Sequence, residues 1–90
     1  MFMEFEFDPR KAAANALKHG VSFAHAEQAL RDPCALTADD PDVTAERRML
    51  TLGMDALGRI LIVVHTQRDG RTRIISARKA SPGERAQYHA

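Results

Sequence analysis

The sequence predicts an α+β fold, in which an antiparallel β-sheet carries two N-terminal helices on one face and a short C-terminal helix, in the order β-α-α-β-β-β-β-α. Three strand-like runs follow one another at residues 47–54, 59–67 and 71–79. Asp69 and Gly70 lie between the last two runs, and this dipeptide is a strong signal for a tight β-hairpin. Two consecutive helical patterns precede the runs, so both helices are expected to cover one face of the sheet. The 90 residues suffice for one domain, which we expect to span residues 1–90.

The first strand and the most apolar strand mark the edge and the centre of the predicted sheet. Residues 2–7 alternate in a strand pattern that turns Met3, Phe5 and Phe7 inward, and an edge position is expected. The run 60–64 is apolar without alternation, which is typical of a central strand covered on both faces.

Capping residues delimit the two N-terminal helices. Asp8 is placed to cap the start of the first helix, and Gly20 ends it. Ser22 opens the second helix, which ends at Asp32. Residues 34–46 indicate a short strand followed by an acidic loop.

The C-terminal stretch gathers most of the chemically useful side chains. Strand 71–79 carries basic residues on both of its faces, which a purely structural strand does not need. Ser81, with Glu84 three residues later, forms the capping-box pattern that starts a helix. Glu84 and Tyr88 are four residues apart and therefore share one helix face. Together these residues form a constellation suited to phosphodiester chemistry.

Charge is distributed unevenly along the chain. Residues 1–58 carry 6 Lys and Arg against 10 Asp and Glu, whereas residues 59–90 carry 7 against 2. A basic half of this kind suits a polyanion, although a solvated strand face with ordinary arginines is the alternative. The single cysteine, Cys34, cannot form an intramolecular disulfide, and the acidic N-terminus does not resemble a signal peptide. Since no apolar run approaches the length of a membrane span, we expect a cytoplasmic protein.

The histidines and the acidic loop give no metal or cofactor pattern. His19, His25, His65 and His89 lack the close spacing of zinc ligands. The acidic loop lacks the further ligands and the central glycine of an EF-hand. No metal or cofactor is therefore expected. His65 lies in the middle of an apolar strand, so we expect it to be a core residue.

Several short motifs occur in order along nearly the whole chain. They are Lys18-His-Gly-Val-Ser-Phe23, Arg73-Ile-Ile-Ser-Ala-Arg78 and Glu84-Arg85-x-x-Tyr88, with Asp8, Lys11, Asn15, Asp32 and a turn at Gly58-Arg59. A chain with these motifs at this separation resembles the BrnT family. The resemblance implies a type II toxin, a small ribonuclease with a RelE-like fold that inhibits translation. It also implies neutralisation by a BrnA antitoxin that carries a ribbon-helix-helix DNA-binding part.

RNA cleavage without a metal ion needs a base for the 2′-hydroxyl, cations for the charge on the phosphate, and an acid for the leaving oxygen. In keeping with RelE-like enzymes, we expect arginine, lysine and tyrosine to supply these groups. Arg78 is the candidate for stabilising the transition state, and Arg68 for a second phosphate contact. Glu84 would act as the base if burial raises its pKa, and Tyr88 would orient the substrate or donate a proton. His19 is a further catalytic candidate.

Four other basic residues are expected to hold the RNA backbone without reading its sequence: Lys18, Arg71, Arg73 and Lys79. Several of these assignments have structural alternatives. His19 would serve as a helix C-cap, Glu84 as a capping residue only, Tyr88 as a core residue, and Arg73 as the partner of an acidic residue in the N-terminal half.

Two other functional classes are open on the sequence. One is a non-catalytic nucleic-acid-binding module, and the other is a subunit that only holds its partner. The antitoxin is expected to cover the basic face, because neutralisation follows directly; the acidic loop and N-terminal half are the alternative docking surface. Contact with DNA is expected only through the antitoxin, because this chain has no helix-turn-helix or ribbon-helix-helix pattern.

Overall fold

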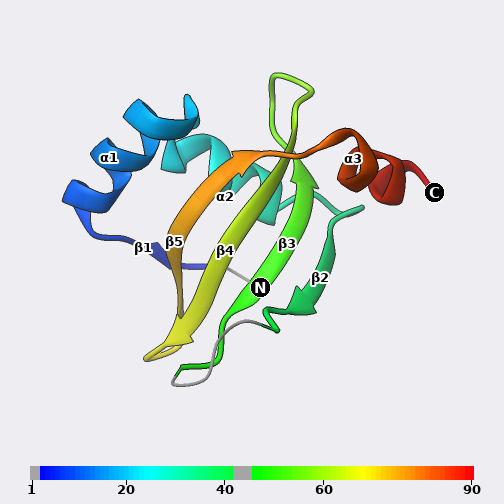
Figure 1. Ribbon diagram of the computed structural model, residues 1–90. Coiled ribbons are helices and arrows are strands. Elements are labelled where there is room, and N and C mark those ends of the chain that lie inside the picture. Colours follow the sequence, from blue (N-terminus) through cyan, green and yellow to red (C-terminus); the bar gives the residue numbers. More distant parts are fainter. Residues whose placement is uncertain (1–2, 42–45) are drawn as a thin grey trace.

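Residues 3–41 and 46–90, which the computed structural model describes, form a five-stranded sheet and three helices (Figure 1). In chain order the elements are β1 (Phe5–Glu6), α1 (Pro9–His19), α2 (Phe23–Leu30), β2 (Leu36–Asp39), β3 (Met49–Met54), β4 (Ile60–Arg68), β5 (Arg71–Lys79) and α3 (Pro82–His89). This order agrees with the prediction. Residue 2 of the predicted first strand, and residues 42–45 of the predicted acidic loop, lie outside the described residues.

The sheet is mixed, so the expectation of a purely antiparallel sheet was wrong. Its strand order is β1-β5-β4-β3-β2, and β2 to β5 form the predicted antiparallel meander. β1 lies at the edge, as expected, but it runs parallel to β5, with Phe5 opposite Thr72 and Glu6 opposite Arg73. Antiparallel neighbours need only a tight turn, whereas the parallel pair is joined through the whole intervening chain.

β1 is shorter than predicted, and two of its three predicted inward side chains are exposed. It contains two residues because α1 begins almost immediately, with Asp8 capping its start. Phe5 packs against the core, but Met3 and Phe7 are 43% and 38% exposed. The predicted inward orientation of Met3 was therefore wrong, whereas Phe7, although partly exposed, packs edge-on against the buried ring of Phe23, with 5.4 Å between the ring centroids.

α2 covers one face of the sheet, while α1 packs mainly along β5. Buried side chains of α2 form one apolar cluster with Leu61 and Val63 of β4. α2 approaches β3 so closely that a Cβ at Gly53 would lie 2.2 Å from the carbonyl oxygen of Ala29. Both N-terminal helices were expected to cover this face; α1 reaches the same cluster through Ala12, and α2 alone spans it.

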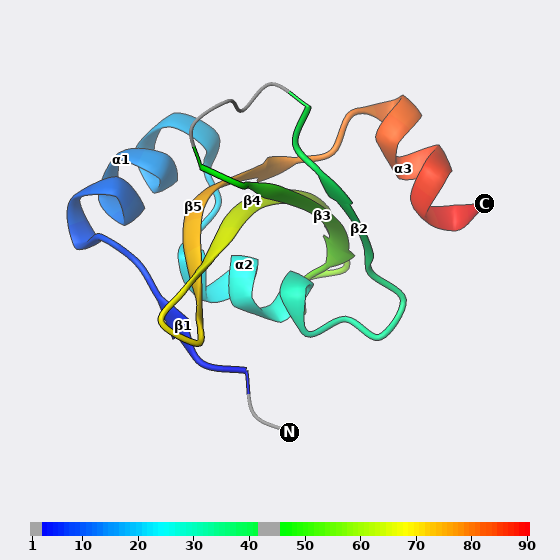
Figure 2. The ribbon, with the colours of Figure 1, turned by 90° about the horizontal axis from the view of Figure 1, so that it is seen from below.

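The opposite face of the sheet, which we term the open face, carries the alternate side chains of the same strands. Ile60 and Ile62 of β4 form a second cluster there with Leu52, so the prediction that β4 is apolar on both faces is confirmed. α3 packs over one end of this face through Tyr88, and Figure 2 shows α2 and α3 on opposite sides of the sheet. The register places Arg78 beside Ile62 on the open face.

The hairpin between β4 and β5 turns at Asp69 and Gly70, as predicted. Their φ angles are 53° and 76°, the left-handed values that a type I′ turn requires at both central positions. Among the described helices, none is long and apolar enough to cross a membrane.

Candidate functional site

Arg78 and Glu84 form a two-point ion pair where β5 leads into α3. The Arg78 guanidinium donates from Nη1 to Glu84 Oε1 at 2.8 Å and from Nη2 to Oε2 at 2.9 Å. Glu84 Oε1 also accepts the backbone N–H of Ser81 at 2.7 Å, which completes the predicted capping box. The sequence therefore correctly grouped these residues.

The ion pair fixes the charge state of Glu84. Hydrogen bonds from Arg78, then from the Ser81 backbone, lower the pKa of Glu84 to about 2. The same hydrogen bond raises the pKa of Arg78. The expectation that burial raises the pKa of Glu84 was wrong, because its donors outweigh burial. Glu84 is thus an ionised carboxylate that is already bound to an arginine.

Tyr88 anchors the other end of α3 to the loop that follows α2. Its hydroxyl donates to Asp32 Oδ2, which also accepts the backbone N–H of Met54 at 2.9 Å. Burial alone would raise the pKa of Asp32, but these hydrogen bonds and one from the Cys34 N–H lower it. The Asp32 hydrogen bond, with burial, raises the pKa of Tyr88 to about 12. Tyr88 is therefore a protonated donor, and it also packs on the open-face cluster.

A basic hollow of about 220 Å³ lies between α1 and β5. We term it the cationic hollow, and its lining residues are Lys11, Ala14, Asn15, Lys18, His19, Ile75 and Ser76. Neither Lys11 nor Lys18 forms an ion pair with an acidic side chain in the described ranges. Gly20, in the left-handed conformation, is the C-cap of α1, and His19 is the last helical residue before it, at the helix end where the structural alternative placed it.

The cationic hollow and Arg78 are neighbours on the open face. Ser76 lines the hollow and pairs with Val64, while Arg78 pairs with Ile62. Residues two apart in a strand point to the same face and are separated by about 7 Å. One side of the sheet therefore carries the Ser76 hydroxyl and the Arg78 guanidinium of β5, and the basic residues of α1 lie beside them.

The other predicted basic residues lie elsewhere. Arg68 pairs with Glu46 at 3.6 Å and Arg71 with Glu4 at 3.2 Å, at the far hairpin of β4 and β5. Arg71 and Arg78 are seven positions apart on β5, which corresponds to about 23 Å along a strand, so the structure does not bring Arg68 and Arg71 to Arg78. Lys79 follows Arg78 directly and projects to the opposite face by strand alternation.

Arg73 forms an ion pair with an acidic residue of the N-terminal half, which was the structural alternative to RNA binding. Its guanidinium lies 3.5 Å from Glu6 of β1, an acidic residue of the N-terminal half. His65 is a core residue, as expected: it is 6% exposed, and its Nε2 lies 2.7 Å from the Thr51 hydroxyl. Burial lowers the pKa of His65, which favours the neutral ring.

Sequence reasoning assigned no role at the site to Lys11, Ser76 and Asp32. Lys11 and Lys18 are seven residues apart, so they lie on one side of α1 two turns apart, and this spacing was a usable signal. Asp32 had no local signal, because its partner Tyr88 is 56 residues away. In the part of the chain that the structure describes, no three His, Cys, Asp or Glu side chains gather in a way that could hold a metal ion.

Comparison with known proteins first gives the class of protein. The structure is similar to the crystal structure of the Brucella abortus ribonuclease toxin BrnT, with a TM-score of 0.65 and 28% sequence identity over 89% of this chain and 99% of that chain. The profile of a family described as the ribonuclease toxin, BrnT, of type II toxin-antitoxin systems matches residues 7–84. The chain therefore belongs to the BrnT family of ribonuclease toxins, as the motifs predicted. A search of curated proteins gave no match.

Proposed function

We propose that this chain is an endoribonuclease toxin that cleaves RNA without a metal ion and so inhibits translation. Membership of the BrnT family supports the activity. The observation that carries the proposal is the placement of Ser76 and Arg78 on the same face of β5, beside the cationic hollow. A phosphodiester chain crossing this face would meet cations along its path.

Lys11 and Lys18 would hold the RNA backbone at the cationic hollow. Both are free of acidic partners among residues 3–41 and 46–90, so their charge is available to phosphate. Such contacts release counterions and weaken as salt rises. Arg68, Arg71, Arg73 and Lys79 would contact RNA only at a distance from this site. The first three would have to leave their acidic partners to do so.

Arg78 would stabilise the charge that develops on the phosphate when the 2′-oxygen attacks. Its planar fork matches two phosphate oxygens, and it stays charged at any working pH. Glu84 holds the same fork in the free protein, so phosphate would have to replace the carboxylate. We assign Glu84 the role of positioning Arg78 until RNA arrives.

Proton transfer would fall to His19. Imidazole is the side chain most often used for this task, and His19 lines the cationic hollow next to the path of the backbone. It would accept the 2′-hydroxyl proton as the 2′-oxygen bonds to phosphorus, and the 5′-oxygen would take a proton from water as its bond to phosphorus breaks. Tyr88, protonated and bound to Asp32, would keep α3 and Glu84 in place.

The partner would be a BrnA-type antitoxin with a ribbon-helix-helix part, and contact with DNA would occur only through it. The type II description of the family supports a protein antitoxin. We expect the toxin to act in the cytoplasm, where translation takes place.

A non-catalytic nucleic-acid-binding or partner-holding module is the second candidate. The observation in its favour is that Glu84 occupies the Arg78 fork, so the candidate catalytic arginine is not free in this structure. Such a module would bind RNA through Lys11 and Lys18 and leave it intact.

The test in cells is growth inhibition by the chain expressed without its antitoxin. Arg78→Ala should abolish inhibition while the purified variant keeps the wild-type fold and antitoxin affinity. The matched control is Arg10→Ala, which removes an exposed arginine at the start of α1 and should stay inhibitory. An Arg78→Ala protein that still stops growth contradicts the assignment.

A further inference from the structure

One edge of the sheet is unprotected. Among the described strands β2 pairs only with β3, and all four of its residues are exposed. The Asp40 N–H donates to the Arg48 carbonyl oxygen at 2.9 Å, and bonded pairs alternate along an antiparallel ladder. The backbone groups of Thr37 and Asp39 therefore point outward. Within the described ranges, neither residue has a backbone hydrogen bond outside the ladder. A free edge of this kind is a template for another strand.

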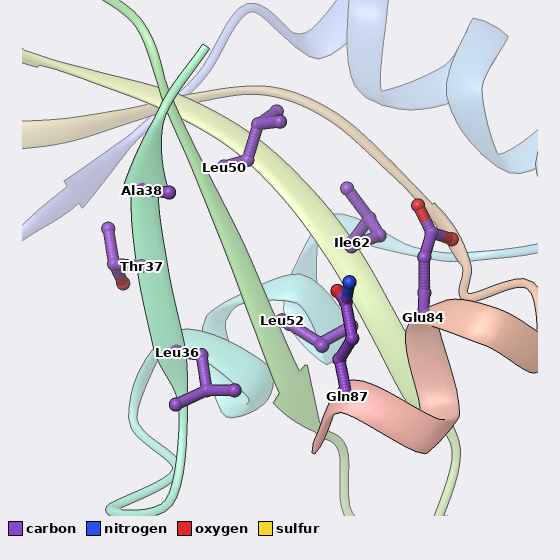
Figure 3. A pocket seen from close by; sticks show the side chains of 8 residues that line it. All are labelled: Leu36, Thr37, Ala38, Leu50, Leu52, Ile62, Glu84 and Gln87. Carbon is purple, nitrogen blue, oxygen red and sulfur yellow. The ribbon is translucent and has the colours of Figure 1, made fainter. Parts of the chain in front are cut away.

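An apolar groove runs between this edge strand and α3 (Figure 3). Leu36 and Ala38 of β2 form one wall, Glu84 and Gln87 of α3 stand on the other side, and the groove encloses about 220 Å³. Its floor is the aliphatic surface of Leu50, Leu52 and Ile62. The small side chain of Ala38 leaves the groove open toward the edge, and Leu36 is 49% exposed. Apolar anchors that fill such hollows dominate the affinity of protein interfaces.

The charge around β2 selects between a protein and RNA as the occupant. Residues 31–48 carry five acidic residues and three arginines, a balance of −2, and one of these acids, Asp39, is paired with Arg47 at 3.1 Å. This segment repels a phosphate backbone and attracts a basic one. In the strand order β2 is also separated by β3 and β4 from β5, which borders the cationic hollow. The edge and the hollow are therefore separate surfaces.

We propose that the antitoxin adds an extended segment to the free edge of β2 and inserts an apolar side chain into the groove beside α3. The segment would alternate apolar and basic residues, because one side faces the groove and the chain around it is acidic. This inference rests on the proposed function, which supplies a protein antitoxin. It places the main contact at the acidic edge, whereas the sequence favoured the basic face.

Two pairs of variants test the proposal by calorimetric titration of the full-length chain with its antitoxin. Asp39→Pro removes an outward N–H, which an edge strand tolerates, while Asp39→Ala removes only the carboxylate. Ala38→Phe fills the groove, and Ala56→Phe adds the same ring at an exposed turn residue. The proline and groove variants should bind the antitoxin at least about tenfold more weakly. The two controls should stay within about threefold, and all four should cleave RNA like the wild type.

Amide hydrogen exchange on the wild-type complex gives a test that needs no variant. The N–H groups of Thr37 and Asp39 should exchange more slowly with antitoxin bound than in the free chain. Unchanged exchange there, with protection around the cationic hollow, would overturn the proposal. So would a dimer of the chain alone that protects the same amides. A wild-type chain that binds no antitoxin would instead contradict the proposed function itself.

Discussion

The side-chain amide of Asn15 closes the edge of β5 at Ala77. Asn15 Nδ2 donates to the Ala77 carbonyl oxygen at 2.9 Å, and Asn15 Oδ1 accepts the Ala77 N–H at 3.0 Å. These are the two bonds that a residue of a neighbouring strand would make, and β1 ends too early to make them. Nδ2 also donates to the Val21 carbonyl oxygen at 3.0 Å. One amide thus holds α1, the α1–α2 turn and β5 together beside the cationic hollow.

Replacing Asn15 should destabilise the fold. Asn15→Ala leaves buried backbone groups at Ala77 and Val21 without partners, and we expect a loss of about 2–4 kcal/mol in the free energy of unfolding. Urea denaturation measures it. Leu17→Ala, on the same helix at 91% exposure, is the control and should change stability by less than about 0.5 kcal/mol. Equal stability of the two variants would show that the Asn15 bonds do not hold the edge.

The ion pair between Arg78 and Glu84, which holds the start of α3, should break in a defined pH range. Glu84 is bound as a carboxylate, with its pKa lowered to about 2 from an ordinary 4.5. The contribution of Glu84 to the free energy of unfolding is therefore complete above pH 4.5 and disappears as the pH falls through about 2. The Ser81 and Glu84 amides should lose protection from hydrogen exchange over that range. If the Glu84→Gln variant lost the same amount of amide protection over this pH range, the assignment to Glu84 would be contradicted.

The hydrogen bond from Tyr88 to Asp32, which holds the other end of α3, can be followed by its own optical signal. Tyr88 is the single tyrosine and the chain has no tryptophan, so tyrosinate absorbance reports this residue alone. Because the folded protein favours the protonated phenol, its contribution is complete below pH 10 and disappears as the pH rises through about 12. The absorbance midpoint should lie near 12 in the wild type. In Asp32→Asn the midpoint should move toward 10. An unchanged midpoint would show that Asp32 does not raise the pKa of Tyr88.

Local signals in the sequence predicted most of the elements. The caps at Asp8, Ser22 and Ser81 and the turn at Asp69 and Gly70 involve residues within a few positions of one another, and each forms as expected. The parallel pairing of β1 had no local signal, because its partner lies in β5. The position of α1 likewise depends on a contact between residues 62 positions apart.

The candidate site could be predicted only in part, because sequence patterns indicate contacts between residues that are close in sequence and not those between distant ones. Arg78 and Glu84 are six residues apart and meet across one turn, so sequence reasoning grouped them. The charge state of Glu84 depends on the two-point geometry of that pair, which spacing does not encode. Arg68 and Arg71 appeared to be free cations, but their partners Glu46 and Glu4 lie far away in sequence. For Arg73 an acidic partner in the N-terminal half was considered, and only the structure identifies it as Glu6.

A substitution at Glu84 distinguishes positioning from base catalysis. Glu84→Gln keeps the shape of the side chain and removes its charge. Since the carboxylate has a low pKa and is bound to Arg78, RNA cleavage should stay within about tenfold of the wild type. Removal of a true general base would cost roughly 10²–10⁴-fold. Single-turnover cleavage rates decide between the two, with Glu27→Gln on α2 as the matched control.

The most direct test is incubation of the purified chain, freed of any partner, with a defined RNA in excess EDTA, followed by analysis of the product ends. We expect discrete fragments with 2′,3′-cyclic phosphate ends, formed by the wild type and by Arg10→Ala and lost in Arg78→Ala. Intact RNA with the wild-type chain, or undiminished cleavage by Arg78→Ala, would contradict it.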